Sequence, residues 1–264
     1  MQATINGIRM NWEVSGSEAA PVVVLHHPLA TNLSIWDEIT SVLAPKYRIV
    51  RFDARGHGKT EATKGAYGFE TLTADTIGLM DHLKIERAHF LGLSMGGMVG
   101  QYLGLLNPER ILSLILVSTS SRVPPEGAAM WDDRIKAARE NGMKSQVEGA
   151  MQRWVSEAGR KNAALVARLS KMIESTPVDG YVGWGGAIRS LNITDRLKAI
   201  KLPTRVIVGA LDPATPPAAA EAIHKEIAGS DLIVMPGVSH MLCAEAPAAF
   251  HRHVTEFLAR AVAK

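Results

Sequence analysis

The sequence has 264 residues, of which 47% are hydrophobic and 21% charged, which is enough to bury a substantial core within one domain. The formal net charge is +3 and the basic residues are scattered along the chain, so a nucleic-acid partner is not expected. The only cysteine, Cys243, excludes an internal disulfide and a thiolate zinc site.

Membrane and export signals are also missing from the sequence. No stretch approaches the roughly 18 uninterrupted apolar residues that a membrane span needs. The N-terminus shows neither the basic nor the apolar region of a secretory signal, so we expect a cytoplasmic protein with no membrane partner. His251 and His253 are two residues apart and would point to different faces of a helix, so no metal site is expected.

Taken in chain order, the first half of the sequence alternates between expected strands and expected helices. An edge strand is expected at 8–14, buried strands at 21–26, 47–53, 88–93 and 111–117, and helices at 72–83 and 96–106. The pattern then changes, and between 124 and about 188 only helical segments are expected, near 129–141, 145–157 and 161–174. Strands resume at 204–208 and 232–235, and a last helix covers about 247–261.

This order of elements predicts an α/β fold with a doubly wound, mostly parallel sheet. Residues 1–121 and 190–264 are expected to form the core. Residues 122–189 are expected to form a helical cap, or lid, that is inserted in the core.

The segment Gly92-Leu93-Ser94-Met95-Gly96 matches the pattern G-x-S-x-G between an expected strand and an expected helix. In so sharp a turn, a side chain at either glycine would collide with neighbouring backbone. The following helix would direct its positive end toward the serine. Small residues can also serve close packing alone, but this context favours Ser94 as a nucleophile.

A serine nucleophile needs a histidine base and an acid that orients the base. In this kind of fold the acid and then the histidine follow the serine along the chain, each at the carboxyl end of a strand. Asp212 follows the expected strand 204–208, and His240 follows the expected strand 232–235. We therefore predict that Ser94, Asp212 and His240 form a catalytic triad.

Other acids and histidines fit these positions less well. Asp231 precedes its strand and would lie at the opposite edge of the sheet. Asp53 ends a strand, but the ARGHGKT segment that follows it is typical of a structural turn. His57 in that turn is interpreted as a hydrogen-bonded scaffold residue.

An oxyanion hole requires two N–H groups near the nucleophile. Met95 directly follows Ser94 and is expected to supply one of them. The other is expected from the loop LHHPLATN after the strand 21–26. Pro28 has no N–H, which leaves Leu29 or Ala30, and Leu29 is preferred.

The chain resembles the α/β-hydrolase superfamily and, more narrowly, the 3-oxoadipate enol-lactonases of aromatic catabolism. The likeness covers nearly the whole chain. It includes the segments HPLATNLSIWD, RFDARGHGKT, AHFLGLSMGGMVGQYL, NPERI, MWDDRI, GMKSQVEGAMQRWV, AIRSLNITDRL and VGALDPATPP. The segments MLCAEAP and HHPLA, which touch the expected pocket, depart from the usual lactonase pattern.

The resemblance implies hydrolysis of a small acidic enol-lactone, without a cofactor, to give 3-oxoadipate. It also associates Trp131 and Arg134 with the substrate pocket, where Arg134 could bind the substrate carboxylate. Trp154 is a further candidate for the pocket wall. For all three residues a packing or solvated role is the alternative.

Four alternatives to the enol-lactonase stay open at this point. A carboxylesterase or another lactonase would use the same three residues, and so would a cofactor-free perhydrolase. A small-molecule receptor on a hydrolase fold is a fourth class. The sequence also leaves open a homo-oligomer, the extent of lid motion, and direct attack by water in place of an acyl-enzyme.

Overall fold

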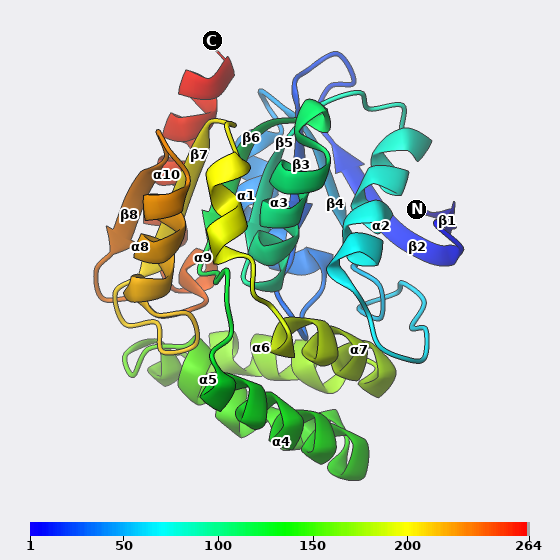
Figure 1. Cartoon of the computed structure of the whole chain (residues 1–264), viewed down its shortest axis with the longest axis vertical. Coiled ribbons are helices and arrows are strands. Elements are labelled where there is room, and N and C mark those ends of the chain that lie inside the picture. The colour runs from blue at the N-terminus through cyan, green and yellow to red at the C-terminus, as the bar shows by residue number, and fades with distance from the viewer. Residues whose placement is uncertain (263–264) are drawn as a thin grey trace.

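The computed structural model describes residues 1–262, and eight strands in this range form one sheet in the order β1-β2-β4-β3-β5-β6-β7-β8 (Figure 1). Neighbouring strands from β4 across to β8 are parallel, whereas β2 is antiparallel to both β1 and β4. The strands are β1 Gln2–Ile5, β2 Ile8–Ser15, β3 Val22–His26, β4 Arg48–Phe52, β5 Ala88–Leu93, β6 Ile111–Val117, β7 Thr204–Gly209 and β8 Asp231–Met235. The predicted doubly wound, mostly parallel sheet is confirmed.

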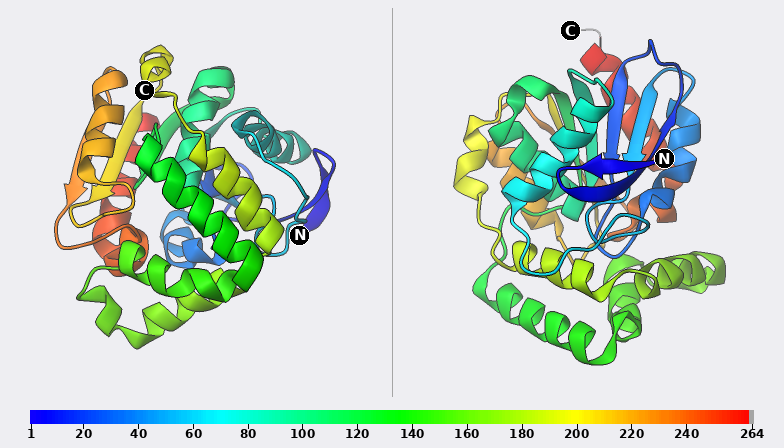
Figure 2. Two further views of the ribbon diagram at one scale, coloured as in Figure 1. Left: turned by 60° about the horizontal axis from the view of Figure 1, so that its bottom comes forward. Right: turned by 90° about the vertical axis from the view of Figure 1, so that its right-hand side faces the viewer.

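Helices cover both faces of this sheet (Figure 2, right). On one face lie α2 Phe69–His82, α3 Met95–Leu106 and α8 Pro217–Glu226, and on the other lie α1 Asp37–Leu43 and α10 Pro247–Val262. Because both faces are covered, every residue of β5 and β7 is buried. Continuous apolar runs in the sequence correspond to such doubly covered strands.

Four helices follow one another between β6 and β7 and lie together at one end of the sheet (Figures 1 and 2). They are α4 Pro125–Asn141, α5 Val147–Trp154, α6 Ala163–Glu174 and α7 Val178–Arg189. We call them the cap helices and keep residues 122–189 as the proposed cap. The remaining short elements are the helix α9 Leu242–Glu245 and single 3-10 turns at Leu33–Trp36, Pro108–Arg110, Met143–Gln146, Gly159–Lys161 and Thr194–Ala199. Within residues 1–262, none of the helices combines the length and the apolar character that a membrane crossing requires.

Residues 8–14 form the predicted strand, but the prediction that this strand lies at the edge of the sheet is wrong. β1 pairs with β2 along its outer side and is itself the edge of the sheet. The two strands are joined at Asn6 and Gly7, which both have positive φ, of 48° and 77°. An Asn-Gly pair is a strong signal for a tight hairpin, and it should have revealed β1.

Helix α7 is absent from the sequence prediction because its composition argues against a helix. It contains four glycines, each of which costs up to about 1 kcal/mol relative to alanine. Packing overrides this cost, since a Cβ on Gly180 would lie 2.0 Å from the carbonyl oxygen of Gly56. In addition, the Trp184 indole N–H donates to the carbonyl oxygen of Arg55 over 2.8 Å. Close backbone contact with the turn at 54–60 therefore holds α7 in place.

This contact predicts opposite effects for two alanine substitutions on the same helix. Gly180→Ala would force a methyl group into Gly56 and should lower the free energy of unfolding by about 1–3 kcal/mol. Gly186→Ala is the matched control, because no atom lies within 4 Å of the added Cβ. It should raise the stability by up to about 1 kcal/mol through helix propensity. Urea unfolding curves of the two variants measure both effects, and equal effects would contradict this account of α7.

Candidate active site

Ser94 lies in a sharp turn between β5 and α3, with the strained backbone angles φ 56° and ψ −112°. Its N–H donates to the carbonyl oxygen of Val117 over 2.8 Å, and its own carbonyl oxygen accepts from the Thr119 hydroxyl over 2.8 Å. A non-glycine residue in this region costs of the order of 1–3 kcal/mol and persists only where its surroundings enforce it. The turn thus holds Ser94 at the carboxyl end of β5, ahead of α3.

The two glycines of the motif allow the chain to pass very close to itself at this turn. A Cβ on Gly92 would lie 2.1 Å from the carbonyl oxygen of Gly96. A Cβ on Gly96 would lie 2.3 Å from the carbonyl oxygen of His26. Neither position has room for a side chain, so the pentapeptide shapes the turn as well as packing α3 against β3.

Asp212 and His240 meet in the loops that follow β7 and β8. The His240 Nδ1 and the Asp212 Oδ2 are 2.8 Å apart, and both side chains are almost fully buried. Asp212 also accepts hydrogen bonds from the N–H groups of Ala214 and Thr215 and from the Thr215 hydroxyl. In a neutral imidazole, an Nδ1 proton donated to the carboxylate leaves Nε2 on the other side of the ring as an acceptor.

The environment of Asp212 keeps it ionised. Burial opposes the charged form, but the His240 imidazole and hydrogen bonds from His240 and Thr215 outweigh it, so the pKa of Asp212 lies below its ordinary value. A carboxylate that remains charged can orient His240 and stabilise its protonated form.

The loop between β3 and α1 approaches Ser94 from the other side. The Ala30 N–H donates to the His57 Nε2 over 2.9 Å, and Ala30 has a positive φ of 55°. Within residues 1–262, the N–H groups of Leu29 and Met95 donate to no protein acceptor. Of the two loop amides considered, Leu29 therefore has the free N–H.

Two buried histidines, His27 and His57, hold this loop in place through hydrogen bonds. His57 accepts from Ala30, and its Nδ1 lies 3.1 Å from the Arg55 carbonyl oxygen. His27 accepts from the Ala54 N–H at its Nε2 over 2.9 Å, and its Nδ1 lies 2.8 Å from the Pro28 carbonyl oxygen. Both rings therefore carry their proton at Nδ1, and the scaffold role predicted for His57 is confirmed.

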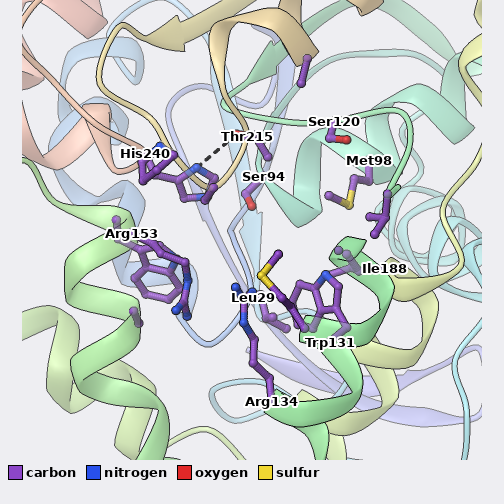
Figure 3. Close-up of a pocket in the computed structure, with 18 of the residues that line it drawn as sticks. Leu29, Ser94, Met98, Ser120, Trp131, Arg134, Arg153, Ile188, Thr215 and His240 are labelled. Carbon is purple, nitrogen blue, oxygen red and sulfur yellow. Dashed lines mark hydrogen bonds between the residues drawn. The ribbon is translucent and has the colours of Figure 1, made fainter. Parts of the chain in front are cut away.

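A cavity of about 470 Å³ lies between the sheet and the cap helices. Ser94, His240 and Leu29 line it (Figure 3), and Asp212 reaches it only through its hydrogen bond with His240. Its size falls in the range of pockets for small ligands. Among the described residues no hydrogen bond joins Ser94 to His240, as is common where such contacts tighten only when a substrate binds.

The cap helices supply the wall of the cavity that faces Ser94. Trp131, Arg134 and Trp154 all line it, as the sequence suggested they could. The Arg134 Cζ lies 5.0 Å from the centre of a Trp131 ring, so the guanidinium stacks on the indole. Burial lowers the pKa of Arg134 from its ordinary value.

Several residues at the site were missed by sequence reasoning. Thr215 braces Asp212, and the Asp-Pro-Ala-Thr spacing of a local Asx-type turn could have revealed it. Arg153 lines the cavity next to Trp154, but nothing in its local pattern separates it from a solvated arginine. In the part of the chain that the structure describes, no group of three or more His, Cys, Asp or Glu side chains could hold a metal ion.

Comparison with known proteins agrees with this geometry. The sequence profile of the alpha/beta hydrolase fold family matches residues 21–247. The chain belongs to this family. As an α/β hydrolase, it carries its nucleophile candidate at the turn where the family's motif predicts it.

Individual relatives point in the same direction. 3-Oxoadipate enol-lactonase 2 of Acinetobacter baylyi is 31% identical over 97% of this chain and 96% of its own. The crystal structure of the enol-lactonase from Burkholderia xenovorans matches with a TM-score of 0.94 and 34% identity, covering 98% of this chain and 100% of the other. A thermophilic esterase from Thermogutta terrifontis, solved with malate bound, has a TM-score of 0.93 and 26% identity, with 99% of both chains covered.

The buried histidines predict how stability depends on pH. Burial lowers the pKa of His27 and of His57 from 6.5 to about 3, so the unfolded chain binds these protons at higher pH than the folded chain does. The stability that depends on the neutral rings is complete above pH 6.5 and is lost as the pH falls toward their folded pKa values. As the pH falls from about 6 to about 4, protonation of each of the two histidines in the unfolded chain should lower the free energy of unfolding by up to about 1.4 kcal/mol per pH unit.

His57→Gln is the control for this prediction. Its amide oxygen can accept from the Ala30 N–H as Nε2 does, but it cannot be protonated in this range. Urea unfolding at a series of pH values gives the slope of the free energy of unfolding against pH. In the His57→Gln variant this slope should be smaller than in the unsubstituted protein by the equivalent of about one proton. An unchanged slope would show that His57 is not held neutral in the folded state.

Proposed function

We propose that this α/β hydrolase opens a small acidic enol-lactone, 3-oxoadipate enol-lactone or a close analogue, through Ser94, His240 and Asp212. The observation that carries the proposal is the buried Asp212–His240 pair beside Ser94 in a cavity with an unpaired Arg134. The enol-lactonase relatives at 31% and 34% identity support the choice of substrate.

The proposed reaction begins with proton transfer. His240, oriented by Asp212, takes the proton of Ser94 as the serine Oγ attacks the lactone carbonyl carbon. The N–H groups of Leu29 and Met95 stabilise the oxyanion of the tetrahedral intermediate, and α3 adds its positive end there. Neither N–H loses a protein hydrogen bond in doing so.

Collapse of the intermediate breaks the ring C–O bond and leaves an ester on Ser94. The leaving oxygen takes the proton from His240 and departs as an enol, which tautomerises to a ketone, so its expulsion is easy. Water then gives a proton to His240 and attacks the ester carbonyl carbon. The Ser94 oxygen recovers that proton, and the product is released as a dicarboxylate.

Arg134 gives the site its expected preference for an acidic substrate. Its guanidinium faces the cavity and forms no ion pair within residues 1–262, so it is available to a carboxylate. Charge-assisted hydrogen bonds of this kind contribute about 1.5–3 kcal/mol. The relative solved with malate supports binding of a small acid by this fold, since malate is a dicarboxylate.

A carboxylesterase is the second candidate, favoured by the esterase relative at 26% identity.

Rates on a panel of lactones distinguish the enol-lactonase from the carboxylesterase. 3-Oxoadipate enol-lactone should give a kcat/KM at least about 10-fold above that of neutral lactones of the same ring size. Arg134→Met should lower kcat/KM for the acidic lactone by about 10–100-fold and leave the neutral lactones nearly unchanged. If the acidic lactone were no better than the neutral ones, the lactonase proposal would be rejected and an esterase favoured.

A further inference from the structure

A second arginine, Arg153, faces the same cavity from a different cap helix. It lies near the end of α5, whereas Arg134 lies in the middle of α4, and the two side chains project into the cavity from separate walls (Figure 3). Both side chains are half-buried. Within residues 1–262, neither guanidinium forms an ion pair or donates a hydrogen bond to the protein. The guanidinium donors of both arginines thus face the cavity, and among the described residues no protein acceptor binds them.

The charges in this space are not balanced by the protein. Burial, followed by the positive charge of Arg134, lowers the pKa of Arg153 to about 10, so both groups stay protonated at neutral pH. Tyr181 beside them stays neutral, because burial raises its pKa and its hydroxyl donates to Gln146. Glu126 at the cavity is exposed and is paired with neither arginine. Holding two like charges close together and partly out of water is unfavourable, and a bound anion would offset this cost.

The position of Arg153 is fixed relative to His240. The Trp154 carbonyl oxygen accepts from the Met241 N–H over 2.9 Å, and the Arg153 carbonyl oxygen accepts from the Ser239 hydroxyl over 3.3 Å. These two contacts lie on either side of His240 in the chain. The end of α5 is therefore tied directly to the loop that carries the proposed base.

Glu245 strengthens the same connection. One oxygen of its carboxylate accepts from the Ser156 N–H over 2.8 Å, just beyond α5. The other oxygen accepts from the Ser239 N–H over 2.7 Å, just before His240. The partly buried Glu245 carboxylate thus joins the two segments, and together with the backbone contacts it sets the spacing between Arg153 and the reacting centre.

We propose that Arg134 and Arg153 together form a subsite for one carboxylate of the substrate. Arg153 sets the distance between this carboxylate and the carbonyl that Ser94 attacks. A carboxylate has about four lone-pair directions and can accept from two guanidinium groups at once. The ligand class is a small ester or lactone whose acyl part carries one free carboxylate. This inference rests on the proposed function in taking Ser94 as the nucleophile and Arg134 as a carboxylate ligand.

The test compares two nitrophenyl esters of equal acyl length, one ending in a carboxylate and one ending in a neutral group. The measured quantity is the ratio of their kcat/KM values. Arg153→Met and Arg134→Met should each lower this ratio by about 10–100-fold, mostly through KM for the acidic ester. The double variant should lose nearly all preference for the acidic ester, because neither arginine then remains to bind the carboxylate.

Two further variants serve as controls. Arg139→Met makes the same charge change on an exposed residue of α4 outside the cavity and should leave the ratio unchanged. Arg153→Lys keeps the charge but loses the planar fork, so it should recover part of the ratio. Succinate binding to Ser94→Ala protein, measured by calorimetry, should weaken by the same factor when Arg153→Met is added.

The outcomes distinguish this inference from the function on which it rests. If Arg153→Met lowered kcat/KM equally for both esters, or left succinate binding unchanged, Arg153 would be structural and the inference overturned. A double variant that kept the ratio of the unsubstituted protein would also overturn it, because the carboxylate would then bind elsewhere. If the ester ratio depended on Arg153 while the enol-lactone was no better than neutral lactones, the inference would stand and the lactonase proposal would fall.

Discussion

The site depends on the strained backbone at Ser94, which the sheet and α3 enforce together. A left-handed φ at a serine is unfavourable by itself, and here the carbonyl of Val117, the hydroxyl of Thr119 and two glycine contacts hold it. The same turn ends β5, begins α3 and leaves the Met95 N–H free. One local constraint thereby places the hydroxyl, a free amide and a helix end within a single turn.

The parallel sheet then gathers the other groups at the same edge. Because β3, β5, β7 and β8 run in the same direction, the loops after them lie side by side at their carboxyl ends. These loops carry Leu29, Ser94, Asp212 and His240. Two neutral imidazoles fix the first loop and Thr215 fixes the third, so burial as well as hydrogen bonding keeps the geometry rigid.

The sequence was informative wherever one local pattern decides the structure. Apolar runs predicted the buried strands, and G-x-S-x-G predicted the turn, because sterics act within a few residues there. Helix α7 could not be predicted, since its glycines are accommodated by tertiary contacts such as that of Gly180 with Gly56, more than 120 residues earlier in the chain. Arg153 was missed for the same reason, because only the folded chain ties the end of α5 to the His240 loop.

The central claim is that Ser94 is a nucleophile activated by His240, and labelling with a fluorophosphonate tests it most directly. Mass spectrometry of the digested protein should find a single adduct, on Ser94, formed by the folded protein and not by the urea-unfolded chain. His240→Ala should slow the labelling by roughly 100-fold or more, since the serine then lacks its base. Folded protein that stayed unlabelled at Ser94, or labelling as fast in His240→Ala, would contradict the account.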